Sequence, residues 1–390
     1  MLGGGRWGLG DSKPVTAGIH GVRVIYDSTC FLQDNVGGIV RYFIEIANRI
    51  GTMPGSVMPA VTVLAGAHGS RVTKSDFEHG LLKGRRMPTF RGSWRIYKAL
   101  NDLAMQAVLS TSSTKPIILH ETYYGAPQLW NRHVKRVITI YDMIWEEEEY
   151  TGADNWVIRA KRASVERADG ILFISESSRQ AFHRHYPQRC SEAVVHLGSE
   201  LRTTRDRKPV DIPWPYILFV GRREFYKNWA RLVEAIGTKQ LWKTHGLVNV
   251  GSPLSTADRE MLRSAGVPDH RVMTLRCDDD TLADLYTAAD CFVFPSLVEG
   301  FGIPLLEAAR CGCPIACSDI PVFREILPDG PGWFDPRSSS SIASSLEYCL
   351  SSGRCAAGTA IAKQTAGAFS WQRTAGETLA FYRSLVPQDS

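Results

Sequence analysis

Two glutamates eight residues apart enclose the segment of this chain that is richest in chemical information. Glu299 and Glu307 flank the sequence Gly-Phe-Gly-Ile-Pro-Leu-Leu, which follows an apolar run and leads into a helical pattern. A proline in the first turn and unpaired N–H groups at a helix start are typical of a phosphate site. On one ideal helix the carboxylates would lie about 12 Å apart along the axis. This spacing suits a long polyhydroxy ligand with a central phosphate, such as a nucleotide sugar; the alternative is a capped helix with two surface glutamates.

A basic loop follows the strand predicted over residues 216–220. Gly221 frees the backbone there, and Arg222 and Lys227, with Arg223 as a competitor, could hold a diphosphate. A leaving nucleoside diphosphate gains negative charge as the sugar bond breaks, so cations aimed at it stabilise the transition state. The alternative is a solvated basic turn.

Two glycines follow the first predicted strand, residues 22–26. Gly37 and Gly38 could let backbone N–H groups approach a phosphate from the opposite domain, or they could form a tight turn. The fingerprint Gly-x-Gly-x-x-Gly is absent, which disfavours a nicotinamide oxidoreductase.

Two further polar residues follow predicted strands. His120 comes after residues 117–119, and Asp142 ends the run 137–141. Both are expected in loops that line a cleft. Each also has a structural explanation, because a histidine at a strand end is often structural and an aspartate often caps a turn.

Short apolar runs alternate with helical patterns along most of the chain, which predicts parallel sheets covered by helices. At 390 residues the chain should form two domains. We predict a flexible leader over 1–20, an N-terminal domain over 21–205 and a C-terminal domain over 211–370. The polar, proline-containing segment 201–215 is the predicted linker, and residues 371–390 contain an amphipathic helix capped by Ser370.

Both domains should be doubly wound, with ligands beyond the carboxyl ends of their strands. A helix is predicted over residues 38–50. The remaining predicted strands are 61–64, 171–174, 194–197, 247–250, 272–275, 292–294 and 314–317.

The composition is ordinary for a soluble globular protein, with 44% apolar and 22% charged residues. No apolar run reaches the length of a membrane span, and the first residues lack the apolar core of a signal peptide. Nine scattered cysteines predict a reducing compartment, so we expect a cytoplasmic location. Cys311, Cys313 and Cys317 lie close together, and small buried residues are favoured there over a metal site.

The net charge is +5, and the basic excess lies in residues 1–210. Residues 81–100 interleave six lysines and arginines with aromatic and apolar residues. This segment could lie on an anionic membrane at the inner face of the cell membrane, or it could form a solvated loop and helix. Nucleic acid is a disfavoured partner, because the total charge is small and no binding module is present.

Together and in this order, the motifs resemble retaining glycosyltransferases of family 4, which have the GT-B fold. That fold is α/β, with two Rossmann-like domains facing a cleft and a C-terminal helix that crosses back to the N-terminal domain. The resemblance runs from about residue 22 to 386 and is most similar to bacterial mannosyltransferases that build surface polysaccharides. It rests on residues 37–42, 220–228, 295–308 and 369–375.

The resemblance implies catalytic roles for four residues. Glu299 would lie by the hydroxyl groups of the donor sugar, Arg222 and Lys227 would hold the diphosphate, and His120 would face the reacting carbon or the acceptor. Glu307 would bind the ribose. The other residues expected at the donor are Gly37, Gly38, Arg223, Val250, Arg276, Cys277, Phe301, Gly302, Ile303 and Leu306, and those expected on the acceptor side are Tyr123 and Asp142.

The implied reaction moves a hexose with retention of configuration and needs no metal or other cofactor. GDP-mannose is the favoured donor, a UDP-sugar the alternative, and the acceptor is a lipid-linked diphosphate or an oligosaccharide. Relatives often carry histidine in place of Tyr141, which weakens a proton-transfer role there. They often carry arginine in place of Tyr226, which makes Arg223 a substitute candidate for the diphosphate.

Two functions of other classes remain open at this stage. A glycoside hydrolase could use the two glutamates as acid and base, and a non-catalytic protein could bind a nucleotide sugar.

Overall fold

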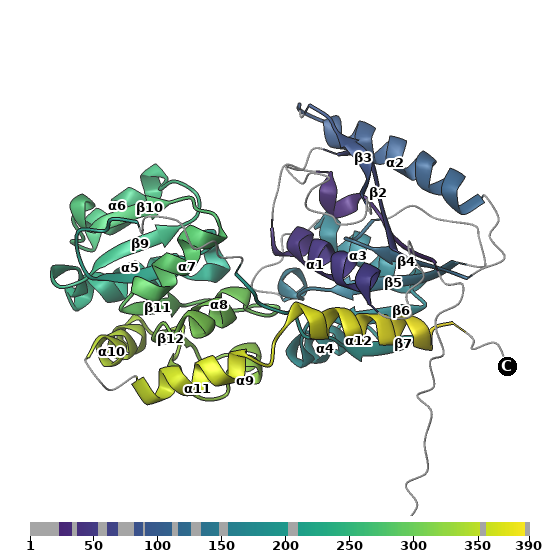
Figure 1. Cartoon of the computed structure of the whole chain (residues 1–390). Coiled ribbons are helices and arrows are strands. Elements are labelled where there is room, and N and C mark those ends of the chain that lie inside the picture. The colour runs from purple at the N-terminus through teal and green to yellow at the C-terminus, as the bar shows by residue number, and fades with distance from the viewer. Residues whose placement is uncertain are drawn as a thin grey trace, which may run out of the picture.

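The chain folds into two α/β units, each a parallel sheet with helices on its faces (Figure 1). The computed structural model describes residues 23–32, 37–53, 61–68, 82–88, 90–110, 116–125, 134–147, 155–201, 210–351 and 356–386. The predicted leader lies outside these residues, as do residues 202–209 of the predicted linker and residues 387–390.

The N-terminal sheet has seven strands in the order β3-β2-β1-β4-β5-β6-β7, all parallel. Helices cover its faces, so its central strands are apolar runs, and β4 is buried at every position. The strands are β1 (Arg23–Tyr26), β2 (Val61–His68), β3 (Leu82–Arg86), β4 (Ile117–Glu121), β5 (Val134–Ile140), β6 (Gly170–Phe173) and β7 (Ser191–Val194). The helices are α1 (Gly38–Thr52), α2 (Ser93–Ser110), α3 (Trp156–Arg167) and α4 (Glu176–His183).

The C-terminal sheet has six parallel strands in the order β10-β9-β8-β11-β12-β13. The strands are β8 (Tyr216–Val220), β9 (Gly246–Val250), β10 (Val272–Leu275), β11 (Cys291–Phe294), β12 (Ile315–Ser318) and β13 (Gly332–Phe334). The helices are α5 (Trp229–Thr238), α6 (Thr256–Ser264), α7 (Asp279–Ala288), α8 (Ile303–Cys311), α9 (Pro321–Ile326), α10 (Ser339–Leu350) and α11 (Ala356–Ala366).

In each sheet the first three strands are added in one direction, and the fourth strand pairs with the opposite edge of the first, so the strand order reverses there. This reversal falls between β1 and β4 in the N-terminal sheet and between β8 and β11 in the C-terminal sheet. Loops at the carboxyl ends of such neighbouring strands diverge and leave a crevice that can bind a ligand. The glycine and glutamate motifs follow β1, β8 and β11, so they lie at these two reversals.

The last helix, α12 (Trp371–Ser384), returns to the N-terminal unit and packs against α1 (Figure 1). Ser370 caps it by accepting a hydrogen bond from the N–H of Arg373. Trp371 and Tyr382 on this helix are buried. The N-terminal core therefore includes side chains from the far end of the sequence.

The segment that leaves the N-terminal sheet runs against the segment that returns to it. The N–H of Ser199 donates to the carbonyl of Phe369 at 3.2 Å. A Cβ atom on Gly198 would lie 2.2 Å from the backbone nitrogen of Trp371, so only glycine fits this crossing. Both connections between the units thus pass through one place, which we call the hinge.

Several sequence predictions need correction. The strand expected at 194–197 ends at Val194; Val195 and Leu197 are apolar because they pack at the hinge rather than in a strand. Residues 81–100 begin with the strand β3, and β13 was not predicted at all. Within the described residues, no helix is both long and apolar enough to cross a membrane.

Candidate active site

Lys227 and Glu299 form an ion pair at the reversal point of the C-terminal sheet. Nζ of Lys227 lies 2.5 Å from Oε1 of Glu299, and the hydroxyl of Ser296 donates to the same oxygen at 2.7 Å. Lys227 also lies over the rings of Tyr226 and Phe294. Two loops that are far apart in sequence therefore place a cation and a carboxylate together.

The loop that carries Lys227 is fixed by its neighbour Asn228, which has a positive φ of 61°. The Asn228 amide donates to the carbonyls of Pro295 and Pro336, and the N–H of Leu297 donates to the carbonyl of Tyr226. Asparagine tolerates this left-handed conformation better than most residues. Tyr226 and Asn228 thereby hold the loop of Lys227 by hydrogen bonds against residues 295–297, which precede Glu299.

Helix α8 begins between the two glutamates. Its N-cap Gly302 has a φ of 121°, and Pro304 stands in the first turn. Such a start presents backbone N–H groups that have no partner within the helix, so it favours an anion. Ile303 is the first residue of α8, as the predicted phosphate site requires.

Glu307 is buried on α8 and has partners from two other helices. Nη1 of Arg41 donates to its Oε1 at 3.2 Å, and the hydroxyl of Tyr286 donates to its Oε2 at 3.3 Å. Burial raises the pKa of Glu307 to about 7, against the charge of Arg41, which lowers it, while the charge of Asp279 adds to the rise. The carboxylate therefore titrates close to neutral pH and can accept hydrogen bonds from a diol when ionised.

The glycines of the N-terminal unit face the start of α8 from the other side. Gly37 is the N-cap of α1 and Gly38 its first residue. A Cβ atom on Gly38 would lie 3.9 Å from Cδ1 of Ile303. The structure thus brings Gly38, Ile303, Glu307 and the Lys227–Glu299 pair to the facing edges of both units.

Gly300 is wedged between the units. The hydroxyls of Ser175 and Ser178, at the start of α4, donate to its carbonyl at 2.8 and 3.1 Å. A Cβ atom there would lie 1.8 Å from the carbonyl oxygen of Tyr141 and 3.1 Å from Cβ of Asp142. Gly300 therefore joins the glutamate motif to the N-terminal unit.

The predicted acceptor residues lie next to this wedge. The ring of Tyr123 stacks on that of Tyr141, with centroids 6.3 Å apart, and burial and the charge of Asp142 raise its pKa. The carboxylate of Asp142 accepts the N–H of Ile144 at 3.2 Å, which is the turn-capping role left open above. Asp142 thus both caps a turn and borders the glutamate motif.

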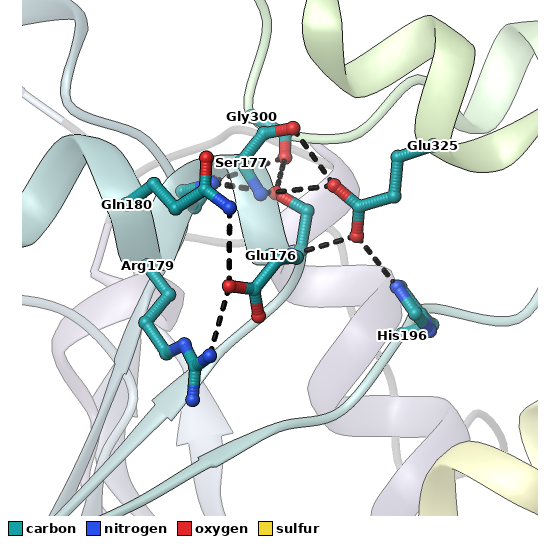
Figure 2. Close-up of polar contacts among 9 residues, drawn as sticks. Glu176, Ser177, Arg179, Gln180, His196, Gly300 and Glu325 are labelled. Carbon is teal, nitrogen blue, oxygen red and sulfur yellow. Dashed lines mark hydrogen bonds and ion pairs between the residues drawn. The ribbon is translucent and has the colours of Figure 1, made fainter.

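A second contact between the units stands beside Gly300 (Figure 2). Glu325 of α9 accepts the N–H groups of Glu176 and Ser177 at the start of α4, at 2.7 and 2.9 Å. Its Oε1 also lies 2.7 Å from Nε2 of His196 at the hinge. These charge-assisted bonds bind α9 to α4.

The two arginines after β8, Arg222 and Arg223, do not contact the Lys227–Glu299 ion pair. Arg223 points to α6, where it meets Asp258 at 3.1 Å and donates to the carbonyls of Ser252 and Pro253. The side chain of Arg222 is 61% exposed and lies 3.6 Å from Glu224. Of the three predicted phosphate ligands, only Lys227 reaches Glu299 in this arrangement.

His120 lies in the core and not at the cleft. β4 extends to Glu121, so His120 is part of the strand instead of the loop after it, and its ring points into the packing between the sheet and α12. Its Nδ1 is 2.5 Å from the hydroxyl of Tyr382, and its Nε2 is 2.8 Å from that of Thr139. Burial lowers its pKa to about 3, so the ring is neutral and structural at pH 7.

The other predicted donor residues fall into two groups. Val250 ends β9, and Arg276 and Cys277 follow β10, so all three lie at the carboxyl edge of the sheet where a base could lie. Phe301 and Leu306 are buried, and Phe301 lies against His196 and Phe369 at the hinge. Their side chains pack the motif in place, and only their backbone could meet a ligand.

Sequence reasoning missed three residues around Glu307: its partners Arg41 and Tyr286, and Asp279, which pairs with Arg41. Arg41 belongs to the Gly-Gly motif but was not assigned a role, although a cation beside two phosphate-site glycines was a usable signal. Tyr286 and Asp279 on α7 left no local signal, because their partners are distant in sequence. The described residues include no cluster of three or more His, Cys, Asp or Glu that could hold a metal ion.

Comparisons with known proteins agree with this geometry. The family model for glycosyl transferases group 1 matches residues 203–364, which span the linker and most of the C-terminal unit. The chain is 26% identical over 383 residues to the O-antigen chain mannosyltransferase B of Escherichia coli, covering 89% of this chain and 96% of the relative.

Two solved structures share the fold. Sucrose-phosphate synthase from Thermosynechococcus elongatus matches with a TM-score of 0.72 at 18% identity, covering 94% of this chain and 99% of its own. Anabaena HepE, solved with UDP and glucose, matches with a TM-score of 0.67 at 16% identity and covers 94% and 99%. The predicted GT-B architecture is confirmed. Residues 203–364 thus form a glycosyl transferase group 1 domain, and the chain is a glycosyltransferase that resembles bacterial polysaccharide mannosyltransferases.

Proposed function

We propose that this protein transfers a hexose from a nucleotide sugar with retention of the anomeric configuration, as a member of glycosyltransferase family 4. Mannose from GDP-mannose is the first candidate, because a mannosyltransferase is similar over nearly the full length of the chain. A UDP-sugar is the alternative donor. No metal or other cofactor takes part in this proposal.

One observation carries the proposal: the Lys227–Glu299 pair stands beside the loop that leads into α8, Glu307 lies on that helix, and Gly38 of the opposite unit lies against Ile303 at its start. In this arrangement Glu307 receives the ribose, the start of α8 and Lys227 receive the diphosphate, and Glu299 receives the sugar. Lys227 gives up part of its contact with Glu299 as negative charge grows on the departing phosphate. A cation fixed there stabilises the transition state more than the ground state.

Retention follows if the acceptor attacks from the side that the diphosphate leaves. The bond from the acceptor oxygen to the anomeric carbon forms as the bond to the phosphate oxygen breaks, and that phosphate oxygen takes the acceptor proton. His120 has no part in this step, because it is buried and neutral. Tyr123 and Asp142 are proposed to border the acceptor.

The first experiment is a thermal-shift panel of GDP, UDP and the other nucleoside diphosphates, since a ligand that binds only the folded state raises the melting temperature. The Lys227→Ala variant should lose turnover more than donor affinity, and Glu307→Ala should mainly lose affinity. Lys239→Ala is the matched control, because Lys239 stands at the C-terminal end of α5 and pairs with the exposed Glu347 of α10.

No stabilisation by any nucleoside diphosphate would reject the proposal. Release of sugar from a neutral oligosaccharide would favour hydrolysis instead. Wild-type turnover in Lys227→Ala would remove the role of that cation.

The proposed acceptor is lipid-linked, and the proposed location is the inner face of the cell membrane. Six of the ten exposed large apolar residues of the described chain lie on or just before α2, and among these Phe90 is 59%, Leu100 52% and Leu103 64% exposed. Arg91 and Arg95 are exposed beside them. An apolar face bordered by cations is typical of a helix that lies on an anionic bilayer.

Flotation with liposomes tests this location. Vesicles with anionic lipid should bind the protein at low salt, and neutral vesicles should bind it less. Leu100→Ser with Leu103→Ser should abolish binding, whereas Ile361→Ser, at an apolar position on α11 that is 46% exposed, should not. Equal binding by both variants, or none by the wild type, would overturn the membrane proposal without affecting the donor site.

A further inference from the structure

Arg41 extends from the N-terminal unit into the C-terminal one. It lies on the first turn of α1, where its N–H donates to the carbonyl of the N-cap Gly37 at 3.1 Å. Its Nη1 donates to Glu307 at 3.2 Å, and its Nη2 lies 3.4 Å from Asp279 at the start of α7. Nη2 also donates to the carbonyl of Glu200 in the segment between the two sheets. One guanidinium therefore touches both units and the connection between them.

The carboxylate that Arg41 contacts, Glu307, is buried, and burial disfavours its ionised form unless a cation lies next to it. The Glu307 side chain is 5% exposed, and removing an ionised carboxylate from water without a counter-charge is costly. Tyr286 supplies a hydrogen bond but no charge. Arg41 is the cation in contact with Glu307 among the described residues.

We propose that Arg41 is a positioning residue for donor binding: reaching across from the opposite unit, it orients Glu307 as a carboxylate for the ribose diol and ties nucleotide binding to the closed arrangement of the units. The inference rests on the proposed function, which assigns the ribose to Glu307. It adds that the ribose site is built from both units. The site is incomplete when the units move apart, because the cation leaves with α1.

The pH dependence of donor affinity shows whether Arg41 only holds the two units together or also positions Glu307 as a carboxylate. The groups around Glu307 are Arg41 from α1, Asp279 and Tyr286 from α7, Cys277 before α7, and Cys311 on α8 itself. Burial raises the pKa of both thiols to about 11, so they stay neutral up to pH 9. Glu307, with a pKa of about 7, is the group expected to change charge in the range from pH 6 to 9.

The sign of the effect follows from the contacts. The ionised carboxylate accepts the ribose hydroxyls, so affinity rises as pH rises through the pKa of Glu307. Arg41 lowers this pKa, and its removal raises it, so the rise in affinity moves to higher pH. A shift of one unit would lower the ionised fraction of Glu307 at pH 7 from about one half to about one tenth, so binding would weaken by about fivefold there and stay close to normal at high pH.

The experiment measures the affinity of GDP and of UDP by calorimetry from pH 6 to 9. Arg41→Gln should bind about fivefold more weakly at pH 7 and recover toward pH 9, Arg41→Lys should keep the wild-type pH profile, and Glu307→Gln should lose the part of the pH dependence that Glu307 causes. Arg49→Gln is the matched control, because Arg49 lies on the same helix and pairs with Glu45 and Glu200 but not with Glu307. Its profile should be that of the wild type.

Two outcomes separate the inference from the proposed function. If the wild type binds GDP or UDP but Arg41→Gln has the same affinity and pH profile, the inference is wrong and the proposed function stands. If the wild type binds neither nucleotide, the proposed function itself fails. Unfolding curves without ligand check that each variant is folded, and Arg41→Met, which also removes the charge, carries the test if Arg41→Gln does not fold.

Discussion

Replacing Gly300 by alanine tests whether the glutamate motif is held by contact with the opposite unit. The added Cβ would lie 1.8 Å from the carbonyl oxygen of Tyr141, 2.9 Å from its carbon and 3.1 Å from Cβ of Asp142. Ordinary contact begins near 3.4 Å, so the facing backbones must separate by about 1.6 Å. Two of these three atoms are backbone atoms, so a change of rotamer cannot relieve the clash.

The cost has two parts. Overpacking of this kind costs about 1–3 kcal/mol, and separating the units weakens the hydrogen bonds from Ser175 and Ser178 to the Gly300 carbonyl, at about 1 kcal/mol each. Because Glu299 is the adjacent residue, it shifts with the loop. A misplacement near 1 Å can lower turnover by about a hundredfold. Donor affinity should fall less, because Lys227 and Glu307 belong to the C-terminal unit and loss of the Arg41 contact across the units is expected to cost only about fivefold at pH 7.

The assay is turnover of the nucleotide sugar identified by the thermal-shift panel, together with calorimetric binding of its nucleoside diphosphate. Gly376→Ala is the control: its Cβ would meet only the flexible end of Met53 at 3.9 Å, and alanine stabilises a helix interior by about 0.5–1 kcal/mol. Wild-type turnover in Gly300→Ala would refute the view that contact between the units positions the motif.

Three further substitutions test the contacts that hold the fold. Glu325→Ala should lower the melting temperature at neutral pH, and the difference from the wild type should shrink as the solution is acidified. Burial raises the pKa of Glu325, but the hydrogen bonds that it accepts outweigh burial and lower the pKa overall, so its contribution is present at neutral pH and lost as pH falls through that lowered pKa. A difference that stays constant would contradict this. Tyr382→Phe should reduce the free energy of unfolding in urea by about 1–3 kcal/mol, because it leaves Nδ1 of the buried His120 without its hydrogen-bond partner. An unchanged midpoint of urea unfolding would show that this hydrogen bond does not contribute to stability. Lys161→Met should cost about 3–5 kcal/mol, because it removes the cation 2.8 Å from the buried carboxylate of Glu146; a loss below 1 kcal/mol in chemical denaturation would contradict this.

The architecture could be predicted from the sequence because each strand of a parallel sheet and the loop after it leave a recognisable local pattern. Strands buried on both faces must be apolar runs, and loops at their carboxyl ends must carry glycine and polar residues, so both sheets and the positions of Gly38, Lys227 and Glu307 could be predicted. The edges were harder. β3 lies in the segment 81–100, which was interpreted by its positive charge and not as a strand. β13 has only three residues, Gly332–Phe334, too few to show the alternation or the apolar run of a strand.

Side-chain partners could not be predicted, because each depends on a residue far away in sequence. His120 stands one residue beyond the predicted strand end, and that one residue decides between a loop over the cleft and a buried strand position. Arg223 turns away from the phosphate site because Asp258 attracts it, and Arg41 reaches Glu307 because the units face each other. None of these choices has a local cause.

The return of α12 has a consequence for how the protein is made. A ribosome delivers the N-terminal sheet first, and domains commonly fold in the order in which they emerge. Here the entire C-terminal sheet is synthesised before Trp371 and Tyr382 exist to fill the N-terminal core. The N-terminal unit therefore keeps one face of α1 uncovered until residues 371–384 have been synthesised. Nascent chains stopped before residue 371 should be the form on which chaperones act.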